Sequence, residues 1–165
     1  MSIVDLERAF NLIGNFEEEE RFFGGKNPEN LIEKAEQDLD LQFPKTYRKF
    51  LKEYGYGGIN SLDIDGITEY KFDGSDYGGV VWNTLNYRND FSYPKYLIPI
   101  YNVGEGTIYC LDTSQMNEEG ECPVVAWPLG GYEETPVLEV VAEDFGKFFL
   151  DMVQRQIEYK NALAK

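Results

Sequence analysis

The sequence predicts an α+β fold: a central, mostly antiparallel β-sheet packed by N-terminal helices and a long C-terminal helix. Apolar residues recur at helical spacing near both ends of the chain. Between Gly57 and Val141 the pattern changes to short β-branched and aromatic runs separated by Gly, Asn, Asp and Pro. Two of these runs flank the glycine-rich residues 104–106, which is a hairpin signal.

The first helices are expected before residue 56. Residues 3–13 carry apolar side chains at helical spacing. Asn27 is a good N-cap and Pro28 suits a first helical position, so a second helix is expected to begin there. A third helix is expected to follow Pro44 and to end near Gly55, where a C-terminal glycine cap belongs.

The middle of the chain carries the strand signals. The expected strands are Ile59–Ile64, Ile67–Phe72, Val80–Asn83, Leu97–Asn102, Thr107–Asp112, Val124–Trp127 and Val137–Val141. Several are apolar on both faces, so the sheet is expected to be covered on both sides or to meet a partner with one face.

The last element is expected to be a helix from about Glu143. Glu143 and Asp144 favour its positive N-terminal end. An apolar stripe follows, typical of core packing, at Phe145, Phe148, Phe149, Met152, Val153 and Ile157. The 165 residues fit a single α+β domain at residues 26–165, preceded by an N-terminal arm or helix at residues 1–25.

The sequence also indicates a compartment. No apolar run approaches the roughly 18 residues that span a bilayer, and the N-terminus lacks the pattern of a signal peptide. A cytoplasmic location is therefore expected. Cys110 and Cys122 are expected to be reduced thiols there, although their pairing stays open.

The chain is strongly acidic, with 30 acidic residues, 15 basic residues, no histidine and a net charge of −15. Such a charge repels phosphate backbones and anionic lipids, so direct binding to nucleic acid or membrane is not expected. Residues 96–142 hold eight acids and no Lys or Arg. Solubility alone does not require such a stretch. The uneven charge favours a one-sided surface for a basic partner.

Catalytic groups are scarce. Without histidine there is no Ser-His or Cys-His pair and no His-based zinc site. No phosphate-binding or dinucleotide-binding glycine motif is present, so no catalytic residue, metal or cofactor is expected. Asp63 and Asp65 leave open an acid pair of the glycosidase kind, and with Glu69 an incomplete calcium loop. Thirty acids make such clusters common by chance.

Three segments resemble the SUKH superfamily. The run IEKAEQDLDLQFPKTYRKFLKEYGYGG, residues 32–58, resembles its opening motif of two helices and a paired glycine turn. LIPIYNVGEGTIYCLD resembles its central hairpin, with Thr107 where the family usually has an acid, and AEDFGKFFLDMV resembles its last helix. The resemblance spans about residues 28–153. It implies an α+β fold and, for most bacterial members, an immunity protein that binds a toxin.

The leading hypothesis is therefore an immunity protein or antitoxin that occludes a basic, nuclease-type toxin. A nuclease needs a basic cleft, which an acidic inhibitor complements. Aromatic residues of the β-rich middle, Trp82 among them, are either core residues or interface anchors. The candidate partner-binding residues are Glu105, Asp112, Glu118, Glu119, Glu121, Glu133 and Glu134, with Tyr101, Trp127 and Tyr132 as anchors. A regulatory scaffold or peptide-binding module and a carbohydrate-active enzyme with an acid pair are the alternatives.

Overall fold

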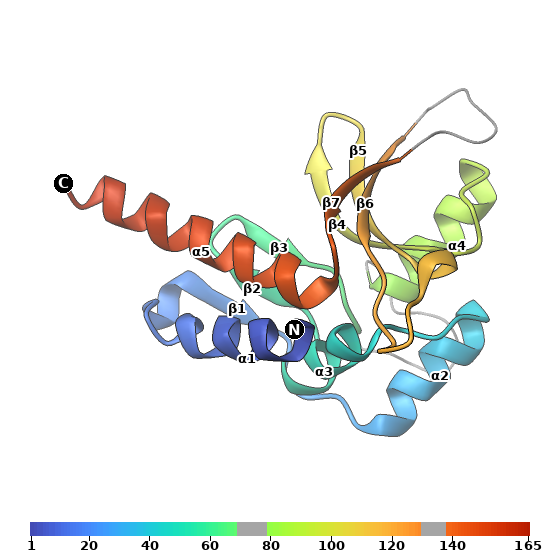
Figure 1. Cartoon of the computed structure of the whole chain (residues 1–165), viewed down its shortest axis with the longest axis horizontal. Helices are drawn as coiled ribbons and strands as arrows, with labels where there is room; N and C mark the ends of the chain where they lie inside the picture. The colour runs from blue at the N-terminus through green and yellow to red at the C-terminus, as the bar shows by residue number, and fades with distance from the viewer. Residues whose placement is uncertain (69–78, 130–137) are drawn as a thin grey trace.

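The computed structural model describes residues 1–68, 79–129 and 138–165 (Figure 1). The elements in chain order are α1 (Ser2–Ile13), η1 (Glu18–Glu20), β1 (Arg21–Phe23), α2 (Glu29–Leu39), α3 (Lys45–Glu53), β2 (Gly57–Ile59), β3 (Leu62–Ile64), α4 (Val80–Asp90), β4 (Leu97–Gly104), β5 (Thr107–Asp112), η2 (Thr113–Gln115), β6 (Val124–Pro128), β7 (Glu139–Ala142) and α5 (Phe145–Leu163).

The α+β fold class is confirmed, with N-terminal helices, antiparallel strands and a long C-terminal helix. In the described residues the strands form two sheets rather than one. One has the order β1-β2-β3 and the other β4-β5-β6-β7, and every pairing is antiparallel. The two sheets are joined where the N–H of Asp65 donates to the carbonyl of Ile100 at 2.8 Å.

The predicted hairpin is confirmed between β4 and β5. Gly104, Glu105 and Gly106 have φ values of 92°, 55° and 83°, so three consecutive residues lie in the left-handed region. Glycine adopts such angles without strain, which explains two glycines at this turn. The turn places Glu105 at the exposed tip of the four-stranded sheet.

Two strand predictions were wrong in the described residues. Val80–Asn83 opens helix α4: Gly79, with extended backbone angles, is its N-cap, and the buried Val80, Val81 and Thr84 share one helix face. The segment Ile59–Ile64 is a hairpin of β2 and β3 rather than one strand. Asn60, with φ of 51°, makes the turn between them.

Two further strand predictions fall partly on residues outside the described ranges. Ile67–Phe72 is described only at Ile67 and Thr68, which are not in a strand. The last predicted strand is described from Leu138 onward, and β7 begins at Glu139. Strand β1 was not predicted, because three residues without alternation give no period to read.

The helix ends agree with the sequence except at α2. Its N-cap is Pro28, and the Asn27 side chain instead donates to the carbonyl of Leu51 at 2.9 Å. Gly55 follows α3 with φ of 77° and donates to the last turn, as predicted. Asp144 caps α5 by accepting from the Lys147 N–H at 2.8 Å.

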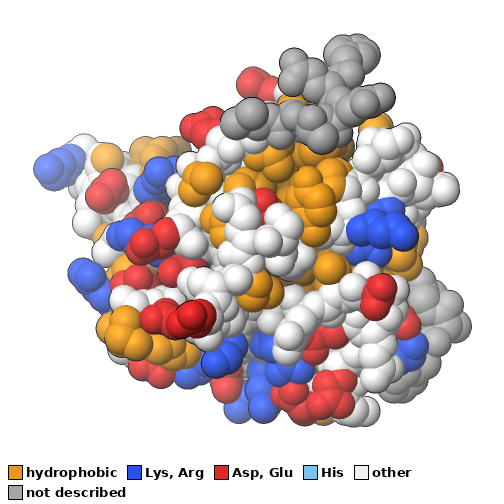
Figure 2. Space-filling model, turned by 45° about the vertical axis from the view of Figure 1, so that its right-hand side comes forward, with side chains coloured by type: hydrophobic (Ala, Val, Ile, Leu, Met, Phe, Trp, Pro, Cys, Tyr) orange, Lys and Arg blue, Asp and Glu red, His pale blue; other side chains and the backbone are white. Residues whose placement is uncertain are grey.

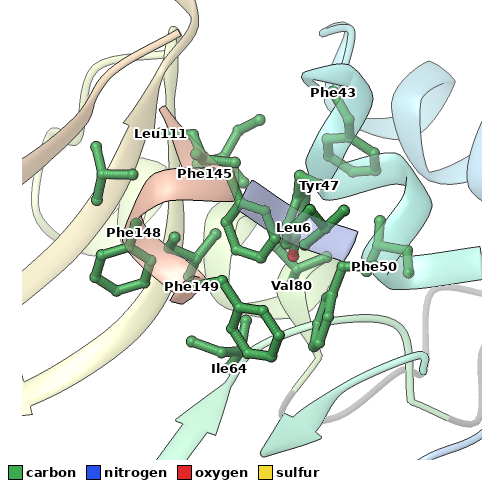
Figure 3. Packing of buried hydrophobic residues seen from close by; sticks show 14 of the residues in the cluster. Leu6, Phe43, Tyr47, Phe50, Ile64, Val80, Leu111, Phe145, Phe148 and Phe149 are labelled. Atoms are coloured by element: carbon green, nitrogen blue, oxygen red, sulfur yellow. The ribbon is translucent and has the colours of Figure 1, made fainter. Parts of the chain in front are cut away.

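The hydrophobic core lies on both faces of the four-stranded sheet. One face joins the main cluster, in which aromatic residues of α3 and α5 pack beside Leu6 of α1 (Figure 3). The other face carries a smaller cluster with Leu97, Ile108, Val125 and Trp127, which packs against Tyr87 of α4. Both faces are therefore covered, as the apolar pattern of the strands predicted.

Helices α1 and α5 run side by side in the same direction (Figure 1). Gly146 permits their close approach, because a Cβ atom there would lie 2.1 Å from the carbonyl oxygen of Ser2. Farther along, the Lys160 ammonium pairs with Glu20 at 2.7 Å. The N-terminal helix thus contributes fully buried side chains, Leu6 and Ala9, to the main core.

Candidate protein-binding surface

The acidic residues predicted to bind a partner lie at two ends of the four-stranded sheet. Glu105 is at the tip of the β4–β5 hairpin. Asp112 ends β5 at the other end of this six-residue strand, about 20 Å away, and Glu118, Glu119 and Glu121 follow it. Tyr132, Glu133 and Glu134 lie outside the described residues. The structure therefore does not bring the described acids into one patch.

Asp112 is buried and holds the chain after β5 in place. Its carboxylate accepts from the N–H of Ser114 at 3.1 Å, the hydroxyl of Ser114 at 2.6 Å and the amide of Gln115 at 2.7 Å. These bonds cap η2. Only 6% of Asp112 is exposed, so its charge acts inside the fold.

Glu121 is also buried, at the start of helix α3. Its carboxyl group accepts from both the N–H and the hydroxyl of Thr46. Burial raises the pKa of this carboxyl group. Nearby, the Ser2 hydroxyl donates to Asp144 at 2.7 Å and accepts from the Gly146 N–H at 3.2 Å. The first turns of α1, α3 and α5 thus meet at a buried polar cluster.

Glu118 and Glu119 are exposed on the turn that precedes Glu121. The side-chain oxygen of Asn117 fixes this turn by accepting from the N–H groups of Glu119 and Glu121 at 2.9 and 3.0 Å. Lys45, which lies outside the acidic stretch, places its side chain against Gly120 in this turn. It therefore brings a positive charge close to these acids. Beside it is a groove of about 400 Å³ lined by Met1, Ser2, Ile3, Lys45, Thr46, Glu119 and Glu121.

The two described anchor candidates point to opposite faces of the sheet. Tyr101 is partly exposed and packs toward the main core, with its ring 6.5 Å from that of Phe148. Trp127 is only 6% exposed and stacks edge-on against Tyr93 at 5.4 Å. Trp82 is half-buried on α4. Tyr101 is therefore the described aromatic residue that is better placed to touch a partner.

Acidic residues of the helical segments form ion pairs with Lys or Arg, whereas the exposed acids of the four-stranded sheet do not within the described residues. The ion pairs of the described residues lie within residues 7–52, between Lys147 and Asp151, or between Glu20 and Lys160. Across the described part of residues 96–142, the exposed carboxylates of Glu105, Glu118, Glu119 and Glu139 have no such pair. Figure 2 shows one face, where hydrophobic side chains gather in the upper middle and Lys and Arg lie around them, to the left, to the right and below.

Asp63 and Asp65 occupy different environments. Asp63 is exposed on β3, whereas Asp65 follows that strand and is largely buried. Burial, and secondarily the charge of Asp63, raises the pKa of Asp65 to about 7. The side-chain amide of Asn83 donates to Asp65 at 3.4 Å, and the Tyr47 hydroxyl donates to its backbone carbonyl at 2.6 Å. Asp65 therefore links α3, α4 and the two sheets.

The two cysteines are separate buried thiols. Cys110 belongs to the smaller cluster and Cys122 to the main core, so they lie on opposite faces of the sheet. The Tyr93 hydroxyl donates to the Cys110 sulfur at 2.6 Å. Burial raises the pKa of each thiol to about 12, which keeps both protonated and unreactive at neutral pH.

Within residues 1–68, 79–129 and 138–165, no three or more Cys, Asp or Glu side chains gather as metal ligands would. A search of the same residues for a helix long and apolar enough to span a membrane finds none.

Sequence reasoning did not single out Glu139 or Val140 of β7. Both are exposed, and Val140 retains 58% of its accessible surface. In the sequence they are two positions of the predicted strand Val137–Val141, and nothing local distinguishes them from their neighbours. Their importance comes from the place of β7 at the edge of the sheet, which requires the strand order.

The sequence matches a family model described as "SUKH_5: SMI1-KNR4 cell-wall" over residues 6–154. The match contains all three motif segments found in the sequence. It also begins upstream of them and takes in most of helix α1, which lies outside those motifs.

Proposed function

Because this chain belongs to the SMI1-KNR4 (SUKH) family, we propose that it is an immunity protein that binds a cognate toxin and covers its active surface. Family membership supports an immunity-like or SMI1-KNR4-type role. The toxin, its basic character and its nuclease activity are parts of the proposal. The proposed place of action is the cytoplasm, where unpaired thiols such as Cys110 and Cys122 persist.

One observation carries the choice of a basic partner. Glu105, Glu118, Glu119 and Glu139 are exposed and lack ion pairs within the described residues, in a stretch that contains no Lys or Arg. Carboxylates without local cations are available to the cations of another protein. Complementary charge mainly speeds association and selects the partner, and salt weakens it.

A nuclease-type toxin fits this surface. An enzyme that cleaves nucleic acid needs Lys and Arg around its substrate cleft, because the phosphate backbone carries one negative charge per nucleotide. An inhibitor with exposed carboxylates competes for the same cations. Occlusion requires no catalytic group in the inhibitor, in keeping with a chain that has no histidine.

Co-expression with the product of the neighbouring gene tests the proposal. We expect the chain to restore growth to cells that make the toxin and to co-purify with it. Raising the salt concentration should slow association, as expected for charge steering. Growth arrest that persists despite soluble expression of both proteins would reject the immunity role.

A regulatory scaffold is the second candidate, favoured by the cell-wall description of the matching family. A scaffold would bind a partner that is not toxic by itself. The co-expression experiment separates the two, because only an immunity protein changes survival.

A further inference from the structure

Strand β7 is an open edge of the four-stranded sheet. It pairs with β6 on one side, with Ala126 opposite Glu139 and Val125 opposite Val140. On its other side, the described residues provide no hydrogen-bond partner for the backbone of Glu139–Ala142. In Figure 1 the strand lies at the front of the sheet and leads into α5. An edge strand of this kind presents N–H and C=O groups that another strand can pair with.

The opposite edge of the same sheet is protected. Strand β4 accepts a hydrogen bond at Ile100 from the backbone of Asp65, which follows β3, and β4 also contacts α4. Natural sheets commonly cover an edge in this way. The exposed backbone is thus concentrated on β7.

The side chains of β7 add chemical character to its open backbone. Leu138 packs against the Trp127 cluster and Val141 against the main core. Because side chains alternate along a strand, Val140 lies on the same face as Leu138, and Glu139 lies on the same face as Val141. Val140 is 58% exposed. An exposed β-branched residue on an unpaired edge is a site that a second strand can cover.

The charges along this edge are negative. Glu139 begins β7 and Glu143 follows its end, and both are exposed. Neither forms an ion pair within the described residues. The closest cation along the chain, Lys147, pairs with Asp151 at 3.0 Å and interacts more weakly with the charge of Glu143. An added strand that carries Lys or Arg at its ends would meet a carboxylate at each end of β7.

We propose that a basic, extended segment of the partner adds to β7 as a fifth strand. This proposal rests on the proposed immunity function and names the surface through which it acts. Backbone hydrogen bonds would supply affinity, while an apolar contact at Val140 and the carboxylates of Glu139 and Glu143 would select the segment. A strand along β7 would also connect the two separated groups of acids, because β7 runs from the Glu105 end of the sheet toward the Glu121 end.

A synthetic peptide tests the pairing without requiring the toxin. The probe is an acetylated and amidated octapeptide of alternating Lys and Val. We expect it to slow hydrogen exchange in the fragment that contains residues 138–143 and to leave exchange in α2 unchanged. The same peptide N-methylated at every residue has the same charge but lacks residue N–H donors on both edges, and we expect it to give no protection.

Matched variants of the full chain separate the edge from general attraction to an acidic protein. Glu139→Lys and Val140→Lys should each abolish protection by the peptide. Glu158→Lys on α5 and Val4→Lys on α1 are the controls, since Val4 is 56% exposed and resembles Val140 in exposure. Equal protection by the two peptides, no protection of residues 138–143, or equal loss in the controls overturns the proposal.

The complex obtained by co-expression gives an independent readout. If the toxin complex forms and residues 138–143 gain protection, both proposals stand. If the complex forms and the exchange of those residues is unchanged, the β7 proposal is rejected while the immunity role stands. If the peptide protects β7 but the chain does not restore growth, the immunity role is rejected and the edge remains a binding site for basic strands.

Discussion

The carboxyl group of Glu121 accepts two hydrogen bonds from Thr46, one from the backbone N–H at 2.9 Å and one from the hydroxyl at 2.8 Å. Thr46 lies in the first turn of α3, whose N-terminal N–H groups have no partners within the helix. An acid from the loop before β6 therefore caps a helix through Thr46, which lies 75 residues earlier in the chain. The contact joins the β-rich middle of the chain to its helical part.

We predict that Glu121→Ala destabilises the fold by about 1–3 kcal/mol, because it leaves the buried Thr46 N–H and hydroxyl without acceptors. Urea unfolding followed by circular dichroism measures the change. Glu118→Ala is the matched control, since Glu118 is exposed on the same turn and should alter stability by less than about 0.5 kcal/mol. Equal effects of the two substitutions would contradict a capping role.

We predict that Gly146→Ala destabilises the packing of α1 on α5 by about 1–3 kcal/mol. The added Cβ would lie 2.1 Å from the carbonyl oxygen of Ser2 and 2.5 Å from its hydroxyl, so the two helices would have to separate. Gly14→Ala is the control, because its Cβ would contact only the Asn11 carbonyl, at 3.4 Å. A lower melting temperature for Gly146→Ala alone is expected, and an unchanged one would disprove the close approach.

The pKa of Asp65, raised by burial to about 7, predicts how stability depends on pH. Between the usual value of 3.8 and about 7, the folded chain holds this proton while the unfolded chain releases it. Stability from this group is therefore fully present below the lower value. It falls as the pH rises through the window, by up to about 1.4 kcal/mol per pH unit.

Asp65→Asn should remove this fall in stability with rising pH, because the asparagine amide has nearly the shape of the carboxyl group and does not ionise. Urea titrations across the window measure it, with Asp63→Asn as the control on the exposed neighbour. The same pH dependence in wild type and Asp65→Asn would show that Asp65 is ionised throughout. Turnover of a glycan that both substitutions abolish would instead support the acid-pair enzyme.

Much of the fold could be predicted because its signals are local. The glycine cap after α3 at Gly55 and the glycine turn at 104–106 each act within a few residues, and both were predicted from the sequence. Helix α4 was missed because Val80 and Val81 favour strands, and only burial against the rest of the fold overrides that preference. The separation into two sheets also depends on long-range pairing that no local pattern encodes.

The candidate surface was predictable in charge but not in geometry. The stretch from 96 to 142 without Lys or Arg is visible in the sequence. The burial of Asp112 and Glu121 is not, because the partner of Glu121 comes from α3. The approach of Lys45 to Gly120 is equally invisible, and it makes the Glu118–Glu121 turn less negative than the sequence suggests.

The two ends of the sheet therefore differ in charge, because Lys45 lies beside only the Glu118–Glu121 turn among the described acids. Reversing Glu105 and Glu139 together to Lys should slow association with the captured toxin on the order of tenfold at low salt, because no described cation pairs with either carboxylate. Reversing Glu118 and Glu119 should slow it less, since Lys45 already lies beside that turn. Stopped-flow association rates at several salt concentrations measure both effects, which should converge as salt screens the exposed charges. A larger effect at Glu118 and Glu119 would place the toxin over the α1–α3 groove instead of the hairpin end.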